Sequence, residues 1–147
     1  NAYGDPSIDY ANPAAVKALN QALLSLGYGL RHWDLPAGYL CPPVPGRSDY
    51  LHYLADLLAP GAATTIPRGP AIRVLDIGTG ANCIYPLIGA SEYGWSFAGT
   101  EIDRVALRWA QKTVAAHPSV AGLIECRAQL SPADSLRGAI LPGERLT

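Results

Sequence analysis

The feature that most constrains the fold is a glycine-rich turn that directly follows a short run of strand-forming residues. The run extends from Ile72 to Ile77 and leads into Gly78-Thr79-Gly80, after which a helix is expected from about 82 to 91. Glycine lets the backbone turn sharply and approach a ligand that a side chain would repel. A strand that passes through such a turn into a helix is the beginning of a βαβ unit, which predicts a parallel sheet.

The same pattern repeats further along the chain. A second strand is predicted from 96 to 100 and ends at Glu101, and Asp103 is the expected N-cap of a helix that runs to His117, where Pro118 ends it. A third strand is expected from 122 to 127. Strand, helix, strand, helix and strand in this order predict the first half of a doubly wound, Rossmann-like α/β sheet.

A candidate ligand site lies at the ends of the first two predicted strands. Ligands of doubly wound sheets bind beyond the carboxyl ends of the strands, where the segment from Asp76 to Asn82 is placed. Glu101 comes 23 residues after Gly78, at the tip of the second strand, where a carboxylate can accept both hydroxyls of a ribose. The third glycine of a dinucleotide fingerprint is replaced by Cys83, which argues against NAD and FAD. The alternative is structural, because glycine suits any strand-to-helix turn, and Glu101 and Asp103 favour the start of a helix.

The first 70 residues have a different pattern. Asn12 and Pro13 begin an amphipathic helix predicted from 13 to 26, and Ser48 is the expected cap of a second helix that ends at Pro60-Gly61. The aromatic and proline-rich stretch from 28 to 47 predicts an ordered loop packed on the rest of the protein. We therefore expect a helical segment with a Pro-rich loop over residues 1–70 and the glycine-turn domain over residues 71–147.

Composition limits the class of protein. Hydrophobic residues make up 49% of the chain, but no stretch approaches the roughly 20 apolar residues of a transmembrane helix, and the start carries no signal-peptide pattern. We expect a cytoplasmic protein that does not contact membranes. The cysteines, Cys41, Cys83 and Cys126, are far apart in sequence, so neither a disulfide framework nor a metal site is expected.

Several long blocks of the sequence resemble one family. Residues 76–86, Asp-Ile-Gly-Thr-Gly-Ala-Asn-Cys-Ile-Tyr-Pro, are similar to the signature of the large-subunit ribosomal RNA adenine-N6 methyltransferases and of their eukaryotic relatives that act on small nuclear RNA. The similarity extends to residues 8–13, 40–50 and 89–101, and so covers most of the chain up to about Gln129. The resemblance implies a class I methyltransferase fold and S-adenosylmethionine as the cofactor.

The resemblance also assigns roles to residues. It places the glycine turn along the methionine part of the cofactor, Glu101 on the ribose, and Gln129 and Ser131 near the adenine or the substrate entrance. Arg47 resembles the arginine that reaches the cofactor carboxylate, which a guanidinium holds through two charge-assisted hydrogen bonds. The alternative for Arg47 is a surface arginine that caps the next helix. The expected cofactor-binding residues are Arg47, Asp76, Gly78, Thr79, Gly80, Ala81, Asn82, Glu101, Ile102 and Ser131.

One motif expected from the resemblance is missing. Amino-methylating enzymes of this class carry an Asn-Pro-Pro-Phe-type motif after the fourth strand, whereas the one double proline here, Pro42-Pro43, precedes the first. The sequence looks like the amino-terminal piece of a longer enzyme that methylates N6 of a flipped or single-stranded adenine in ribosomal RNA by direct transfer. We expect no catalytic residue in this piece and no turnover from it alone. Two alternatives stay open: a non-catalytic module that binds cofactor or RNA, and a methyltransferase whose acceptor is a small molecule or a protein.

Three further expectations concern contacts with partners. Without a fourth strand beside it, the segment from Ile72 to Ile77 would be an open apolar edge, through which we expect self-association. Tyr28, Trp33 and Tyr39 are candidates to line a base pocket, although packing in an aromatic core is the commoner role. Because the net charge is −1, we expect segments outside this chain to supply much of any affinity for RNA.

Overall fold

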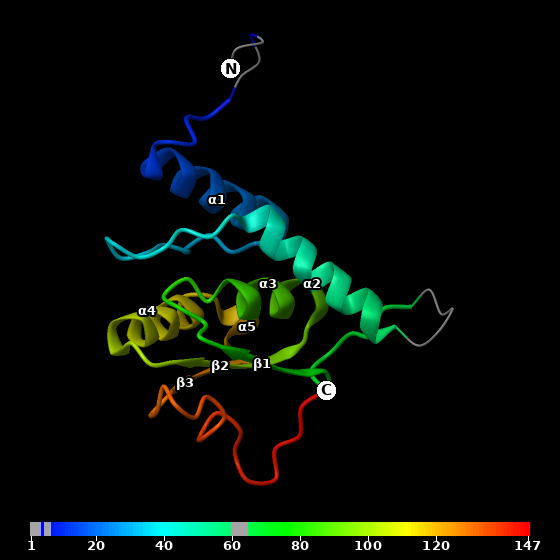
Figure 1. The fold of residues 1–147 in the computed structure, drawn as a ribbon. Helices are drawn as coiled ribbons and strands as arrows, with labels where there is room; N and C mark the ends of the chain where they lie inside the picture. Colours follow the sequence, from blue (N-terminus) through cyan, green and yellow to red (C-terminus); the bar gives the residue numbers. More distant parts are fainter. Residues whose placement is uncertain (1–3, 5–6, 60–64) are drawn as a thin grey trace.

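The computed structural model is an α/β structure with a parallel sheet, and it describes residues 4, 7–59 and 65–147. The sheet has the order β1(Arg73–Ile77), β2(Ser96–Glu101) and β3(Ile124–Ala128), and all its pairs are parallel. Helices α3(Ile84–Tyr93) and α4(Arg104–Ala115) cover one face, while the segment after β3 passes across the other (Figure 1). The predicted fold class is therefore confirmed.

Local signals determine most of the βα elements, although some bounds differ from the prediction. Asp103 caps α4, because its Oδ1 accepts the N–H of Val105 at 2.7 Å. The helix ends at Ala115 rather than at His117, and Pro118 begins the short helix α5(Pro118–Ala121) instead of only ending its predecessor. Proline fits the first turn of a helix because the N–H that it lacks has no partner there. As a result β3 begins at residue 124, two residues later than predicted.

The first helix follows its predicted cap but not its predicted end. The Asn12 side chain accepts the N–H groups of Ala14 and Ala15 at the start of α1(Pro13–Tyr28). The helix continues through Gly27, where the prediction ended it, and stops at Gly29, which adopts the left-handed conformation at φ +71°. A glycine in that conformation is the common helix terminator, so the stop signal lies two residues beyond the predicted one.

The prediction of a loop up to residue 47 and of Ser48 as a helix cap is wrong. Helix α2(Val44–Leu58) has Pro43 as its N-cap and so begins five residues earlier, because a proline in the first turn costs no hydrogen bond. Ser48 lies inside the helix and is buried, where its hydroxyl bonds to the hydroxyl of Tyr28 and to Nε2 of His52 at 3.0 Å. The predicted end at Pro60-Gly61 lies outside the described residues.

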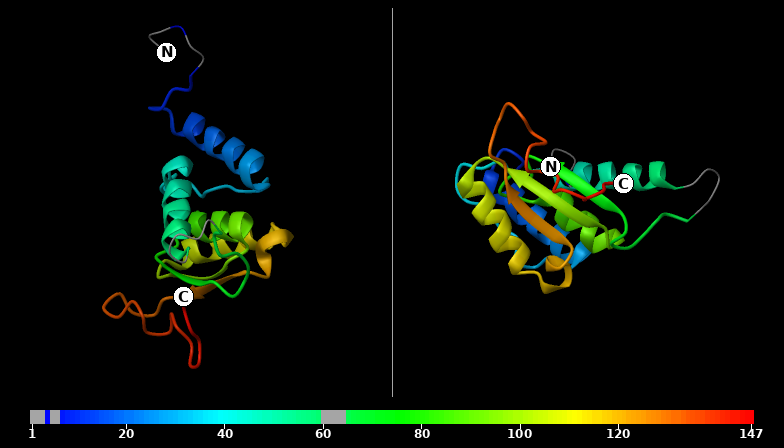
Figure 2. Two further views of the ribbon diagram at one scale, coloured as in Figure 1. Left: turned by 90° about the vertical axis from the view of Figure 1, so that its right-hand side faces the viewer. Right: turned by 90° about the horizontal axis from the view of Figure 1, so that it is seen from below.

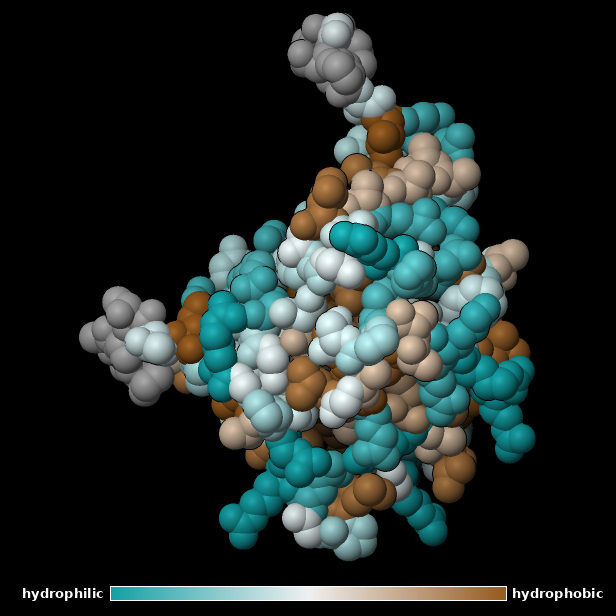
Figure 3. Space-filling view, turned by 180° about the vertical axis from the view of Figure 1, so that it is seen from behind, coloured by the Kyte–Doolittle hydropathy of each residue, from teal (hydrophilic) through white to brown (hydrophobic). Residues whose placement is uncertain are grey.

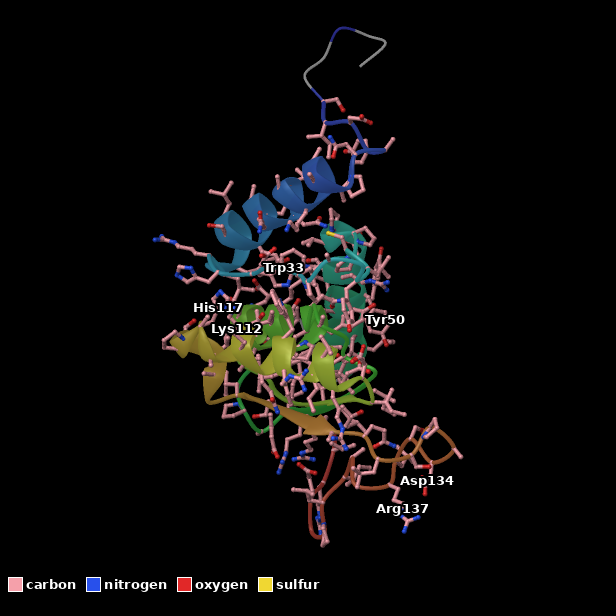
Figure 4. All side chains as sticks on the ribbon, turned by 90° about the vertical axis from the view of Figure 1, so that its left-hand side faces the viewer. Trp33, Tyr50, Lys112, His117, Asp134 and Arg137 are labelled. Atoms are coloured by element: carbon pink, nitrogen blue, oxygen red, sulfur yellow. The ribbon has the colours of Figure 1, made fainter. Side chains whose placement is uncertain are left out.

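The N-terminal helices are stacked on the layer of α3 and α4, on the side away from the sheet (Figure 2). One hydrophobic core runs through both parts, from Leu24 in α1 through Trp33 and Leu87 to Ile124 in β3. Figure 4 shows Trp33 between the N-terminal helices and this layer. The division of the chain at residue 70 stays a prediction, but the packing joins both segments around a shared core.

Two side chains of the α4–α5 region fasten the loop that follows α1. His117 is buried; its Nδ1 donates to the carbonyl of Thr113 at 2.8 Å, and its Nε2 accepts the N–H of His32 at 3.1 Å. The indole N–H of Trp109 donates to the carbonyl of Asp34 at 2.8 Å. These bonds hold the loop beside α4 as an ordered segment, as the Pro-rich composition predicts.

Strand β1 lies at the edge of the sheet, as predicted. Its outer side is contacted at Arg73, whose carbonyl accepts the N–H of Thr147 and whose N–H donates to Oγ1 of Thr147, both at 3.0 Å. Ile77, at the other end of the strand, is 49% exposed. Self-association through this edge stays a prediction.

The surface of the described residues is mixed in polarity. Seen from behind, hydrophilic and hydrophobic side chains are interspersed over the molecule (Figure 3). Among the described helices none is both long and apolar enough to cross a membrane.

Candidate functional site

The glycine turn is fastened to the end of β2 by backbone hydrogen bonds. The N–H groups of Gly78 and Thr79 both donate to the carbonyl of Thr100, each at 2.9 Å. Gly78 has φ +76° and Gly80 has φ +65°, a conformation in which a residue with a side chain is strained. The two glycines are therefore required by the backbone path, and the turn lies beyond the carboxyl ends of β1 and β2 as predicted.

Glu101 joins the glycine turn to the start of α4. Its Oε2 accepts the N–H of Gly80 at 2.9 Å, and its Oε1 accepts the N–H groups of Ile102 and Asp103 at 2.8 and 2.9 Å. A carboxylate offers about four acceptor positions, so these three bonds leave one on Oε2. One ligand hydroxyl can bind there directly, and a second would have to replace the bond from Gly80.

Unpaired polar atoms lie buried beneath the turn. Among the described residues, Oδ2 of Asp76 and Oγ1 of Thr79 are enclosed and have no hydrogen-bond partner. Burial raises the pKa of Asp76 above its ordinary value, and the nearby charge of Glu101 acts in the same direction. Gly99 leaves room for Thr79, because a Cβ there would lie 3.2 Å from the Thr79 hydroxyl oxygen. Buried polar atoms without partners normally bind water or a ligand, so the two atoms beneath the turn suit a polar ligand.

The residues that follow the turn are held from the N-terminal segment. The indole N–H of Trp33 donates to the carbonyl of Asn82 at 2.8 Å, and Oδ1 of Asn82 accepts the N–H of Ile84 at 3.1 Å. Ala81 and Trp33 are both buried, which assigns Trp33 to the core rather than to an open base pocket. Its role in the site is indirect, because it fixes the backbone that carries Asn82.

The other two aromatic candidates also make structural contacts. The hydroxyl of Tyr28 bonds to Ser48 between α1 and α2. Tyr39 lies closer to the candidate site, because its hydroxyl donates to Oδ2 of Asp103 at 2.6 Å, two residues beyond Glu101. The sequence patterns did not predict this contact, which joins residues 64 positions apart.

Arg47 lies in the first turn of α2, where it reaches the beginning of α3. Its Nη1 donates to the hydroxyl of Tyr85 at 2.7 Å, and its guanidinium carbon lies 5.5 Å from the centre of the Tyr85 ring. Tyr85 follows the glycine turn by a few residues, so Arg47 is brought toward the turn although the predicted loop around it is a helix. Sequence reasoning missed Tyr85, which belongs to the same Cys-Ile-Tyr-Pro block as the turn.

The remaining predicted residues lie at the far side of Glu101. Ile102 is 50% exposed and lines a pocket together with Arg104, Arg108 and Gln129. Ser131 is not among the residues that line this pocket; its carbonyl accepts a hydrogen bond from Nε2 of Gln129 at 3.1 Å. The structure therefore brings together Ile102 and Gln129, with Ser131 adjacent. Within the described ranges, no group of three His, Cys, Asp or Glu side chains is arranged to hold a metal ion.

Curated relatives share most of this sequence. Ribosomal RNA large subunit methyltransferase F of Ectopseudomonas mendocina is 59% identical over 146 residues, which are 99% of this chain and 44% of that protein. The protein of the same name from Bacteroides fragilis is 53% identical over 98% of this chain and 50% of its own length. The chain thus spans about half, or less, of the length of these relatives.

Solved structures share the fold. The N-terminal domain of human METTL16 in complex with SAH aligns with 99% of this chain and 54% of that one, at 34% identity and a TM-score of 0.83. The catalytic domain of the same human protein in complex with the MAT2A 3′UTR hairpin 1 covers 92% of this chain at 37% identity and a TM-score of 0.71. A family model described as RNA methyltransferase matches residues 1–146. The chain therefore belongs to this RNA methyltransferase family.

Proposed function

We propose that this chain is the cofactor-binding part of an S-adenosylmethionine-dependent enzyme that methylates N6 of an adenine in large-subunit ribosomal RNA in the cytoplasm. The observation that carries the proposal is the contact between Glu101 and Gly80, because it places a carboxylate against the glycine turn at the tips of two adjacent strands. The names of the curated relatives supply the RNA class, and the neighbour with bound SAH supplies the cofactor class.

The residues present fit such a cofactor. Glu101 retains an acceptor position for a ribose hydroxyl, and the unpaired atoms of Asp76 and Thr79 lie beneath the turn. The turn itself presents backbone without side chains at Gly78 and Gly80. Arg47 supplies a guanidinium for the carboxylate of the cofactor, provided that it exchanges its bond to Tyr85. The bound cofactor supplies a methyl group on a positively charged sulfur, which an amine can attack directly.

The role of this chain is then to bind the cofactor and to orient it toward the acceptor. A direct transfer needs no protein nucleophile, so the rate depends on how accurately donor and acceptor are positioned. Glu101, held by three backbone N–H groups, is already fixed in position before a ligand arrives. The chain has no Asn-Pro-Pro-Phe-type motif, so we propose that it binds cofactor and gives no turnover alone.

Calorimetric titration of S-adenosylmethionine and of its demethylated product into the chain tests the cofactor proposal. We expect a micromolar dissociation constant for the wild-type chain. Glu101→Ala should bind about tenfold or more weakly, since a hydrogen bond to a charged group contributes about 1.5–3 kcal/mol. Arg47→Ala should weaken binding in the same direction. Glu92→Ala is the matched control, because Glu92 pairs with Arg68 at the other end of α3 and should leave binding unchanged. A folded wild-type chain that binds neither compound would contradict the proposal for this chain.

The acceptor is tested separately. The protein in its full reading frame should transfer a labelled methyl group to large-subunit ribosomal RNA, with the label recovered as N6-methyladenosine after digestion. This chain alone, at the same concentration, should transfer none. Label in a small molecule or a protein instead would favour the alternative acceptor class, and cofactor binding without transfer by the full protein would favour a non-catalytic binding module.

A further inference from the structure

Two cysteines meet beneath the candidate cofactor turn. The Sγ atoms of Cys83 and Cys126 lie 4.0 Å apart, although the residues are 43 positions apart in sequence. Cys83 directly follows Asn82 at the end of the turn and is completely buried, whereas Cys126 lies in β3 and is partly exposed. Both thiols are free.

The sheet register explains why the two sulfur atoms are close. Asp76, Gly99 and Cys126 are paired across β1, β2 and β3, so their side-chain positions lie on the same face of the sheet. Gly99 occupies the middle of this row and has no side chain, which leaves space for Thr79 between the outer two positions. Cys83 itself has φ +49° and is the one described residue other than glycine with a positive φ. The contact thus depends on an unusual backbone conformation at the end of the turn.

We propose that Cys83 and Cys126 form a reversible oxidation site, in which a peroxide or a low-molecular-weight disulfide converts the two thiols into a disulfide that weakens cofactor binding. The effect on the cofactor rests on the proposed function, whereas the oxidation itself does not. The two thiols form the site together. Within the described residues each is the other's partner, and no third cysteine hydrogen-bonds to either of them.

The geometry and the ionisation of the pair assign different roles to the two sulfur atoms. The hydrogen bond from Cys83 lowers the pKa of Cys126, while the same bond, together with complete burial, raises the pKa of Cys83. Cys126 is the partly exposed residue of the pair and Cys83 is completely buried, so we assign Cys126 as the attacking thiolate. Cys83 is the resolving thiol.

The reaction with hydrogen peroxide is balanced in two steps. The Cys126 thiolate attacks one peroxide oxygen, the O–O bond breaks, and the departing hydroxide takes a proton to give water, leaving a sulfenic acid. The Cys83 sulfur then attacks the sulfenic sulfur, an S–S bond forms, the S–O bond breaks, and the departing hydroxide takes the proton of the Cys83 thiol. Two thiols and one peroxide become one disulfide and two waters, and a dithiol reductant reverses the change.

The disulfide should disturb the turn. An S–S bond is about 2.05 Å long, so the sulfur atoms must approach each other by about 2 Å from their present separation. Cys126 is held in the ladder of β3, and most of the movement therefore falls on Cys83 and the turn before it. That turn is fixed by Glu101 through Gly80 and by Trp33 through Asn82, so a displacement strains the contacts that position the cofactor.

The test oxidises the purified chain with hydrogen peroxide, or with oxidised glutathione, and measures the intact mass and a peptide map without reduction. We expect the loss of two hydrogen atoms, a crosslink between the peptides of Cys83 and Cys126, and reversal by dithiothreitol. Cys126→Ala and Cys83→Ala should each abolish the crosslink. Cys41→Ala is the matched control and should leave it intact, because the sulfur of Cys41 contacts Asn20 rather than a cysteine.

Calorimetry with S-adenosylmethionine gives the second readout. We expect roughly fivefold or more weaker binding by the oxidised chain, restored on reduction and absent in Cys126→Ala. Stable sulfenic or sulfinic acid at Cys126 without a crosslink, a disulfide that includes Cys41, or unchanged affinity after oxidation would overturn the proposal. The mass readout needs no cofactor. A chain that forms the disulfide but never binds S-adenosylmethionine in its reduced form contradicts the proposed function instead, together with the coupling that depends on it.

Discussion

Replacing Gly89 by alanine should loosen the contact that places α3, and with it the glycine turn, on the sheet. Gly89 lies within α3, and a Cβ at this position would lie 2.7 Å from Cε2 of the Phe97 ring and closer still to Cζ. Phe97 is 3% exposed and cannot move into solvent. Overpacking of a core costs about 1–3 kcal/mol, while alanine gains about 1 kcal/mol over glycine within a helix. Because the contact is shorter than real Cβ atoms tolerate, we expect a net loss of about 1–2 kcal/mol.

Urea unfolding followed by circular dichroism measures this change. With a slope of about 2 kcal/mol per molar urea, the midpoint should fall by about 0.5–1 M without a change in slope. Gly27→Ala is the matched control, because Gly27 lies within α1 and a Cβ there would meet nothing within 4 Å. That variant keeps the gain in helix propensity without the clash and should be more stable than wild type by up to about 1 kcal/mol.

A double variant separates packing from other effects. Phe97→Leu makes room for the added methyl group, so Gly89→Ala should cost less in the Phe97→Leu background than in wild type, and the two changes should not be additive. If Gly89→Ala is instead as stable as Gly27→Ala, or if its cost is the same in both backgrounds, the contact between α3 and β2 is not the one described.

Three further predictions concern the turn, the C-terminal segment and the sheet edge. Trp33→Phe removes the N–H bound to the Asn82 carbonyl and should cost about 1–3 kcal/mol of unfolding free energy and weaken cofactor binding; unchanged values would contradict a fastening role. The hydrogen bond from Arg127 lowers the pKa of Glu144 from its ordinary 4.5 to about 2. The stability that this carboxylate contributes is therefore complete above about pH 4.5 and is lost as the pH falls toward 2. Between these pH values the urea midpoint should depend less on pH in Glu144→Gln than in wild type. Ile77→Lys on the open edge of β1 should reduce association in light scattering at high concentration, and a wild-type chain that is monomeric there would refute self-association.

The parts of the site that follow from parallel strands could be predicted from the sequence. Glu101 and the glycine turn stand at the ends of two consecutive strands, and in a parallel βαβ unit those ends lie side by side. The hydrogen bond between Glu101 and Gly80 is the direct result of this topology. Conformation at Gly78 was equally predictable, because a turn that tight requires a positive φ that favours glycine.

Features that depend on tertiary packing could not be predicted in the same way. Four prolines between 36 and 45 favour a loop on local grounds, yet α2 begins at Val44, because Val44 and Ser48 are buried against the rest of the protein. The contact between Cys83 and Cys126 joins the end of the glycine turn to β3, 43 positions further along, and no spacing in the sequence expresses that relation. Tyr39 and Asp103 meet only because the loop after α1 lies along α4.

The way the glycine turn is held explains why a helical segment outside the sheet matters to the site. The backbone of the turn is fixed from two sides by groups of β2, namely the carbonyl of Thr100 and the carboxylate of Glu101, which come from the α/β part. The third side is fixed by the indole of Trp33, which comes from the N-terminal part. A binding loop that is already fixed at several points loses less conformational freedom when a ligand binds, which raises affinity without a new contact. If the chain binds the cofactor as proposed, we therefore expect residues before β1 to contribute to its affinity, although few of them need to touch it.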